Sequence, residues 1–311
     1  MKRNAGFWVF VFLLAFGASE GFAQQQRLDA ATKVLIPSSA RTAAFNSFLA
    51  VINLDSQDNA ITITARRPDG SVIGTPRSIV LSPNGRFRST DILGEMGGAL
   101  GEFGPITVES TNGRILSAVS EVSSIQGPGG FFPGVNTSSA WLQGYIAEVI
   151  DTGEGGSPGT FRTNIGLNTV TGTPANVSVA FLNNTGTQVG STLSFSVAGN
   201  GMTQVNGIVR DLLNSGGAVT GQNGFLRITS NQPIHAWASK IENGTGDPSF
   251  QIGIGALSGT VISQVLPSGS DARNNLLFVG LALIPAIAFL VLKLRGFDFY
   301  PDDDSLAAQT I

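Results

Sequence analysis

Residues 161–209 read FRTNIGLNTVTGTPANVSVAFLNNTGTQVGSTLSFSVAGNGMTQVNGIV, and this stretch decides the fold because the chain contains it twice. Residues 45–93, FNSFLAVINLDSQDNAITITARRPDGSVIGTPRSIVLSPNGRFRSTDIL, align with it without a gap. Shared residues keep the register throughout: Phe45 with Phe161, Gly70 with Gly186, Gly74 with Gly190, Asn84 with Asn200 and Ile92 with Ile208. A repeat of this length indicates two copies of one module.

Apolar residues alternate with polar ones along both copies. Ile61 and Ile63 point one way while Thr62 and Thr64 point the other, and Val177 and Val179 repeat the pattern. This period of two predicts strands with one buried face.

Turn residues separate these strands. Gly70 and Gly186 stand where a tight turn needs positive φ. The Asn-Gly pairs at 84–85 and 200–201 predict β-hairpins. Short helical turns are expected at 91–93 and 207–213. About seven short strands in each copy favour an all-β fold of two tandem antiparallel β-sandwiches.

Composition excludes several functional classes. Charged residues make up 13% of the 311 residues and the net charge is −3, which gives no basic surface for nucleic acid. Cysteine is absent, so disulfides, thiolate metal sites and cysteine nucleophiles are excluded. A module of roughly 115 residues can bury enough apolar surface to fold without disulfides.

The N-terminus has the features of a secretory signal peptide over residues 1–23. Lys2 and Arg3 precede the apolar run Phe7–Phe16, and Gly21-Phe22-Ala23 is a small-x-small cleavage site. We therefore expect the mature chain to start near Gln24, outside the cytoplasm.

A second apolar run, Leu276 to Leu292, carries no charge and contains Pro285. Its length predicts a transmembrane helix at 274–294, in which a proline is tolerated. Lys293 and Arg295 follow directly, which predicts that the short acidic tail at 295–311 is cytoplasmic. We expect a single-pass cell-membrane protein with its N-terminal domains outside the cytoplasm.

Between these ends the repeat predicts a first β-sandwich at 33–123 and a second at 141–265. The stretch 124–140 between them is rich in Gly, Pro and Ser, which is typical of a partly flexible linker.

The run Phe161-Arg-Thr-Asn-Ile-Gly-Leu, the paired glycine turns, the Asn-Gly pair and Gly244-Thr-Gly-Asp-Pro248 together resemble a known kind of repeat. It is similar to uncharacterised immunoglobulin-like β-sandwich modules in surface proteins of environmental bacteria, acidobacteria among them. The resemblance covers most of residues 33–260. It implies an extracellular structural or adhesive module without catalytic residues.

Catalytic and metal-binding chemistry has few candidates. The one histidine, His235, lies in an expected strand, and the alignment places Leu116 at its position in the first copy, which favours a structural role. The carboxylates stand mostly in turns, where Asp is expected for backbone reasons. Oxygen ligands at Glu242, Asn243 and Asp247, or at Asp55 and Asp58, could bind Ca²⁺, although neither set matches an EF-hand loop. We otherwise expect no cofactor.

Four aromatic residues are candidate ligand contacts: Trp141, Trp237, Phe131 and Phe132. They could form a stacking surface for sugar or protein. The alternative, which the alternation favours, is that Trp237 points into the core while Phe131 and Phe132 pin the linker onto a domain.

The sequence therefore predicts a membrane-anchored extracellular protein, not an enzyme, that presents two β-sandwiches for adhesion to an envelope protein or glycan. The alternative is a non-catalytic subunit or receptor-like component of a cell-envelope complex. A third possibility, an extracellular hydrolase, would need carboxylates from both copies to meet in one cleft.

Overall fold

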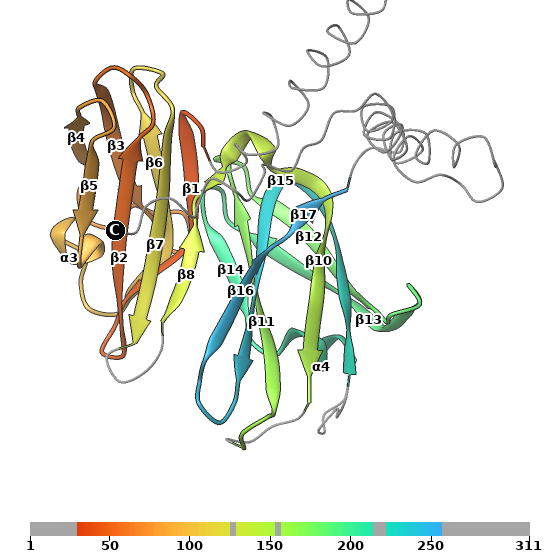
Figure 1. Cartoon of the computed structure of the whole chain (residues 1–311). Helices are drawn as coiled ribbons and strands as arrows, with labels where there is room; N and C mark the ends of the chain where they lie inside the picture. Colours follow the sequence, from red (N-terminus) through yellow and green to blue (C-terminus); the bar gives the residue numbers. More distant parts are fainter. Residues whose placement is uncertain (1–29, 125–128, 153–156, 214–221, 257–311) are drawn as a thin grey trace, which may run out of the picture. The chain divides into compact units, whose positions relative to one another are not determined.

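The computed structural model describes residues 30–124, 129–152, 157–213 and 222–256, all within one compact unit, Met1–Ala256. Over these residues the chain is mostly β, built of antiparallel strands (Figure 1). The predicted signal peptide (1–23), membrane helix (274–294) and acidic tail (295–311) lie outside the described residues. So do the predicted anchor residues Leu276, Pro285, Leu292, Lys293 and Arg295. In the part of the chain that is described, no helix has the length and apolar character needed to span a membrane.

Copy one comprises the described residues up to Asn136. Its elements, coloured red to yellow in Figure 1, are β1 (Lys33–Arg41), β2 (Phe45–Asn53), β3 (Asn59–Ala65), β4 (Arg77–Leu81), β5 (Arg86–Ser89), α3 (Ile92–Glu95), β6 (Glu102–Ser110), β7 (Leu116–Ser124), β8 (Gly130–Pro133) and β9 (Val135–Asn136). The strands form a five-stranded sheet, β4-β3-β6-β1-β9, and a four-stranded sheet, β5-β2-β7-β8. A short 3₁₀ turn, η2 (Thr137–Ser139), leads to copy two.

Copy two begins at Trp141 and repeats this order of elements. They are β10 (Trp141–Asp151), β11 (Phe161–Thr169), β12 (Ala175–Leu182), β13 (Gln188–Val197), β14 (Met202–Val205), α4 (Ile208–Leu212), β15 (Gln222–Glu242), β16 (Pro248–Ile252) and β17 (Ile254–Gly255). The long strand β15 takes the places of both β6 and β7. Its first half pairs with β10 and β12, and its second half pairs with β11 and β16. The two layers are thereby joined into one eight-stranded sheet.

Strand pairing is the same in both copies, residue for residue. Asn53 pairs with Leu116 on β7, and its counterpart Thr169 pairs with Ile234 on β15. This register corrects the alignment at the histidine: Leu116 corresponds to Ile234, so the counterpart of His235 is Ser117. The alignment made from the sequence alone was wrong by one residue at this point, because the copies differ in length between the helical turn and this strand.

Two predictions about the turns have different outcomes. The positive φ expected at Gly70 and Gly186 is confirmed, at 84° and 78°. The hairpins expected at Asn84-Gly85 and Asn200-Gly201 are wrong, because β4 pairs with β3 whereas β5 pairs with β2 in the other sheet. A hairpin turn of this type needs positive φ at both central residues, and here only the asparagine has it. In copy one the tight turn therefore carries the chain from one sheet to the other, and in copy two it carries the chain from β13, paired with β12, to β14, paired with β11.

The expected helical turns are present as α3 and α4. Asp91 caps α3, its Oδ1 accepting from the Gly94 amide at 3.0 Å. Ile92 and Leu93 in α3, and Ile208 and Leu212 in α4, are completely buried. Each helical turn therefore closes one end of its copy's apolar core.

The stretch expected to be a linker, 124–140, contains β8 and β9 instead of a plain connection. β8 pairs with β7, and β9 pairs with β1, so the stretch adds one strand to each sheet of copy one. Exposed strand edges favour further pairing, which accounts for β8 and β9.

Candidate functional site

The two copies share a contact surface, called the seam here. At the seam, strands of copy two pack against β1 and β8 of copy one. Trp237 on β15 lies against Gly166 on β11, where a Cβ atom would come within 2.0 Å of the indole. The indole Nε1 donates to Asn168 Oδ1 at 3.1 Å, and Asn168 Nδ2 donates to the Pro37 carbonyl at 2.9 Å. The absent side chain at Gly166 thus makes room for a tryptophan that links the copies.

Aromatic packing completes the seam. The ring centroid of Phe132 on β8 lies 5.5 Å from that of Trp237 and 4.5 Å from that of Phe250 on β16. Trp237 is only 3% exposed and belongs to the apolar core of copy one, not to that of copy two. A backbone hydrogen bond from Met202 to the Pro68 carbonyl, 3.1 Å long, adds a polar contact. The copies are therefore held together by core-like packing.

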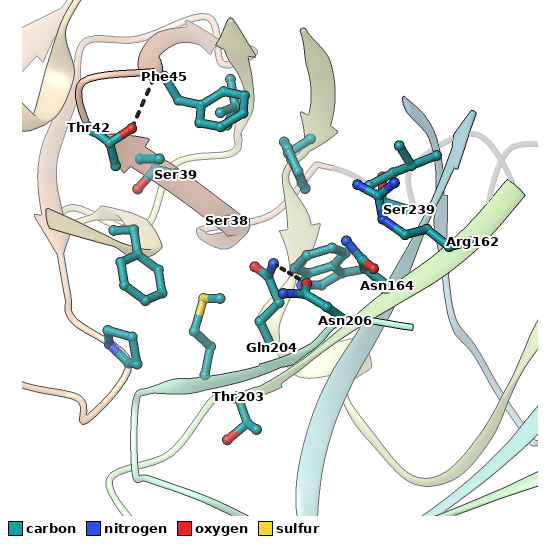
Figure 2. A pocket seen from close by; sticks show the side chains of 18 residues that line it. Ser38, Ser39, Thr42, Phe45, Arg162, Asn164, Thr203, Gln204, Asn206 and Ser239 are labelled. Carbon is teal, nitrogen blue, oxygen red and sulfur yellow. Dashed lines mark hydrogen bonds between the residues drawn. The ribbon is translucent and has the colours of Figure 1, made fainter. Parts of the chain in front are cut away.

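A cleft of about 730 Å³ opens beside the seam and is the main candidate site. Copy one lines it from β1, the turn between β1 and β2, the start of β2, the turn after β3, and β6 to β8, while copy two lines it from β11, β14 and β15 (Figure 2). Trp237 and Phe132 form its buried apolar part, and Phe45 and Phe103, each 42% exposed, stand at the open side. Its volume falls in the range of small-molecule sites.

Amide and hydroxyl groups of copy two face this apolar surface. They are the side chains of Asn164, Gln204, Asn206 and Ser239, whereas the Thr203 hydroxyl donates to the Ser196 carbonyl at 3.1 Å and points away (Figure 2). Gln204 Nε2 donates to Asn206 Oδ1 at 3.1 Å, and Asn164 Oδ1 accepts from the Gly207 amide at 3.0 Å. These bonds fix the amides in place and leave the Gln204 carbonyl and the Asn164 amino group for a ligand.

Charge is sparse in the cleft. Arg162 on β11 is the only charged side chain that lines it among the described residues, and its Nη1 donates to Asn243 Oδ1. The part of the chain that the structure describes places no carboxylate in this cleft, and so supplies no pair of acids there for glycoside hydrolysis.

The four candidate aromatic residues do not form one surface. Trp237 and Phe132 meet in the seam, whereas the neighbouring Phe131 is 62% exposed on the opposite side of β8. Trp141 lies elsewhere, packed against the core of copy two and over Gly144 and Gly255. Phe131 and Phe132 are separated because successive side chains of a strand point to opposite faces, whereas Trp141 is on another strand, β10.

His235 lies next to the seam and is 3% exposed. Its Nε2 is 3.0 Å from the Asn136 carbonyl, an arrangement in which the neutral ring donates. Burial lowers the pKa of His235 from 6.5 to about 4, and the hydrogen bond to Asn136 offsets this only in part. The site is a structural contact between copies.

Two of the carboxylates considered for Ca²⁺, those of Glu242 and Asp55, accept hydrogen bonds from the chain itself. The Glu242 carboxylate accepts from the Thr245 amide and hydroxyl and from the Gly159 amide, and the Thr245 bonds in particular lower its pKa. Asp55 accepts from the Gln57 amide at 3.1 Å and lies 3.7 Å from Arg114 Nη1. Within the described residues, His, Asp and Glu form no group of three or more suited to a metal ion.

Sequence reasoning missed the polar residues of the cleft. Asn164 corresponds to Phe48 in copy one, Gln204 to Arg88 and Ser239 to Glu121. The sequence did contain a signal, namely these mismatches between the copies. The two copies carry similar apolar residues at core positions but different residues at these outward positions.

Comparison with known proteins adds little. No family model and no curated protein matches the chain. Ten chains of solved structures match, among them the crystal structure of Thermotoga maritima 1070, which is 13% identical with a TM-score of 0.30. That match covers 38% of this chain and 96% of the other. At this level the likeness says nothing about function.

Proposed function

We propose that this protein is a membrane-anchored, extracytoplasmic adhesive protein with two tandem β-sandwiches, immunoglobulin-like in architecture, and that the cleft at the seam binds a glycan. The observation that carries the proposal is the cleft, in which aromatic rings meet a row of amide and hydroxyl groups. The anchoring and the location rest on the sequence at 1–23 and 274–294.

The chemistry of the cleft suits a sugar better than an apolar or strongly charged ligand. The C–H faces of a sugar ring pack on exposed aromatic rings such as Phe45 and Phe103, while its hydroxyls exchange hydrogen bonds with Gln204 and Asn164. Arg162 adds a partner for a carboxylate, so glycans that contain uronic acid are the first probes.

Binding of the full-length protein in detergent to a glycan array, followed by calorimetry on any hit, tests this proposal. Gln204→Ala and Arg162→Gln should each weaken binding by about 10-fold, because each removes one ligand hydrogen bond. Arg88→Ala is the matched control, since Arg88 is the counterpart of Gln204 in copy one and lies outside the cleft. Measurements with and without Ca²⁺ test the acidic turns at the same time.

Two outcomes would count against glycan adhesion. The first is binding that is unaffected by both cleft substitutions. The second is no glycan hit together with constant co-purification of other envelope proteins, which would favour the alternative role as a subunit of an envelope complex.

A further inference from the structure

The repeat gives copy one a surface equivalent to the one that copy two buries in the seam. In copy two this surface is the outer side of β14, β11, β15 and β16, where Gly166 pairs with Trp237 and Ser239 pairs with Phe250. In copy one the equivalent pairs are Ala50 with Val119 on β2 and β7, and Glu121 with Phe131 on β7 and β8. The outer side of β5, β2, β7 and β8 is called the open face here.

The open face is apolar at these equivalent positions, although the described residues leave it uncovered. Phe131 is 62% exposed, and Ile52 and Val119 are each 37% exposed. Their counterparts Phe250, Asn168 and Trp237 are all covered by copy one in the seam. The open face therefore exposes apolar side chains beside the charged Arg86, Arg88 and Glu121, and within the described residues nothing covers them.

The other half of the seam, on copy one, also has an equivalent, which lies on copy two and is called the free edge. Ala31, which bridges to Leu116, corresponds to Trp141, which pairs with Ile234. Phe132 opposite Ser120 corresponds to Gln251 opposite Ala238. Next to Trp141, the free edge exposes Leu142 by 54% and Ile254 by 68%.

One polar contact of the seam also has an equivalent between the open face and the free edge. In the seam, His235 of the face reaches the Asn136 carbonyl of the edge. The equivalent positions are Ser117 on the open face and Gly255 on the free edge. A seam-like contact thus brings the Ser117 hydroxyl, a donor, to the Gly255 carbonyl.

We propose that this protein binds a second copy of itself head to tail, the open face of one chain packing on the free edge of the next. The two surfaces are different, so the contact is heterologous and each chain keeps one of each surface available. Repetition of such a contact produces open chains of molecules instead of closed dimers. The proposal does not depend on glycan binding.

The absence of cysteine permits a direct test by cross-linking. In the seam Phe250 lies against Phe132, so the equivalent intermolecular neighbours are Phe131 and Gln251. The full-length protein with both Phe131→Cys and Gln251→Cys, treated in detergent with a short bis-maleimide, should give a ladder of dimers, trimers and higher species. Each single variant alone should remain monomeric, and an equimolar mixture of the two should stop at the dimer.

A substitution on the open face adds an independent measurement. Phe131→Glu should lower the concentration-dependent rise in molar mass seen by light scattering, whereas Val80→Glu should not. Val80 is the control because it is 68% exposed on β4, away from the open face. Dimers of the Phe131→Cys single variant would show a face-to-face contact and overturn the proposal. A mixture of the two single variants that yields only monomer would also overturn it, because no cross-link within one chain is possible there.

Discussion

Replacing Trp237 with alanine should separate the two copies without unfolding either of them. The side chain is 3% exposed, packs on Phe132 and donates to Asn168, which in turn bonds to Pro37. Loss of a buried tryptophan costs about 3–5 kcal/mol, including the cavity that it leaves. In a protein of this size, about 1 kcal/mol of stability corresponds to roughly 2–4 °C in the midpoint of thermal unfolding. This midpoint should therefore fall by about 10 °C.

The matched control is Val119→Ala, at the equivalent position of copy one. Val119 is 37% exposed on the open face, so its truncation should cost less than about 1 kcal/mol. Thermal unfolding gives the size of each effect, and hydrogen exchange gives its location. In the Trp237→Ala protein, exchange should accelerate in β1, which belongs to copy one and is distant in sequence from the substitution.

Two results would refute this reasoning. One is a midpoint for Trp237→Ala within about 2 °C of that for Val119→Ala, which would show that the indole contributes little. The other is exchange that accelerates only within copy two, which would place Trp237 in the core of its own copy.

Three further predictions concern single positions. Gly166→Ala should lower the unfolding midpoint about as much as Trp237→Ala, because its Cβ would lie 2.0 Å from the indole. Arg210→Met should cost about 3–5 kcal/mol in denaturant unfolding, since it removes an ion-pair partner from the fully buried Asp151 carboxylate, and adding Asp151→Asn should recover part of that loss. The pKa of His235 is lowered to about 4, so between pH 6.5 and 4 the unfolded chain binds a proton that the folded chain does not. The free energy of unfolding should therefore decrease as the pH is lowered through this window, by about 2 kcal/mol from pH 7 to pH 5. His235→Gln should lack this loss when unfolding curves are measured at both pH values.

Much of the fold could be predicted from the repeat and its alternation. The register of Phe45–Leu93 on Phe161–Val209 reappears in the pairing of β2 with β5 and of β11 with β14. Positive φ at Gly70 and Gly186 followed from local backbone sterics. These features depend on neighbours in sequence, which is why the sequence could indicate them.

The connections between sheets could not be read in the same way. An Asn-Gly turn looks alike whether the next strand pairs with the last one or crosses to the opposite sheet, and β5 crosses. β8 adds to the edge of the preceding strand β7, whereas β9 forms because β1, remote in sequence, offers an edge for pairing.

By itself, then, the sequence determined that one β module occurs twice, because periodicity, turn residues and the repeat are local properties of the chain. Only the tertiary structure decided what distinguishes the copies. The repeated core is the same in both, and the difference between Trp237 beside Gly166 and Val119 beside Ala50 acquires meaning only where the copies meet. The seam, the cleft beside it and the uncovered face of copy one all follow from contacts between residues far apart in sequence, which no local pattern records.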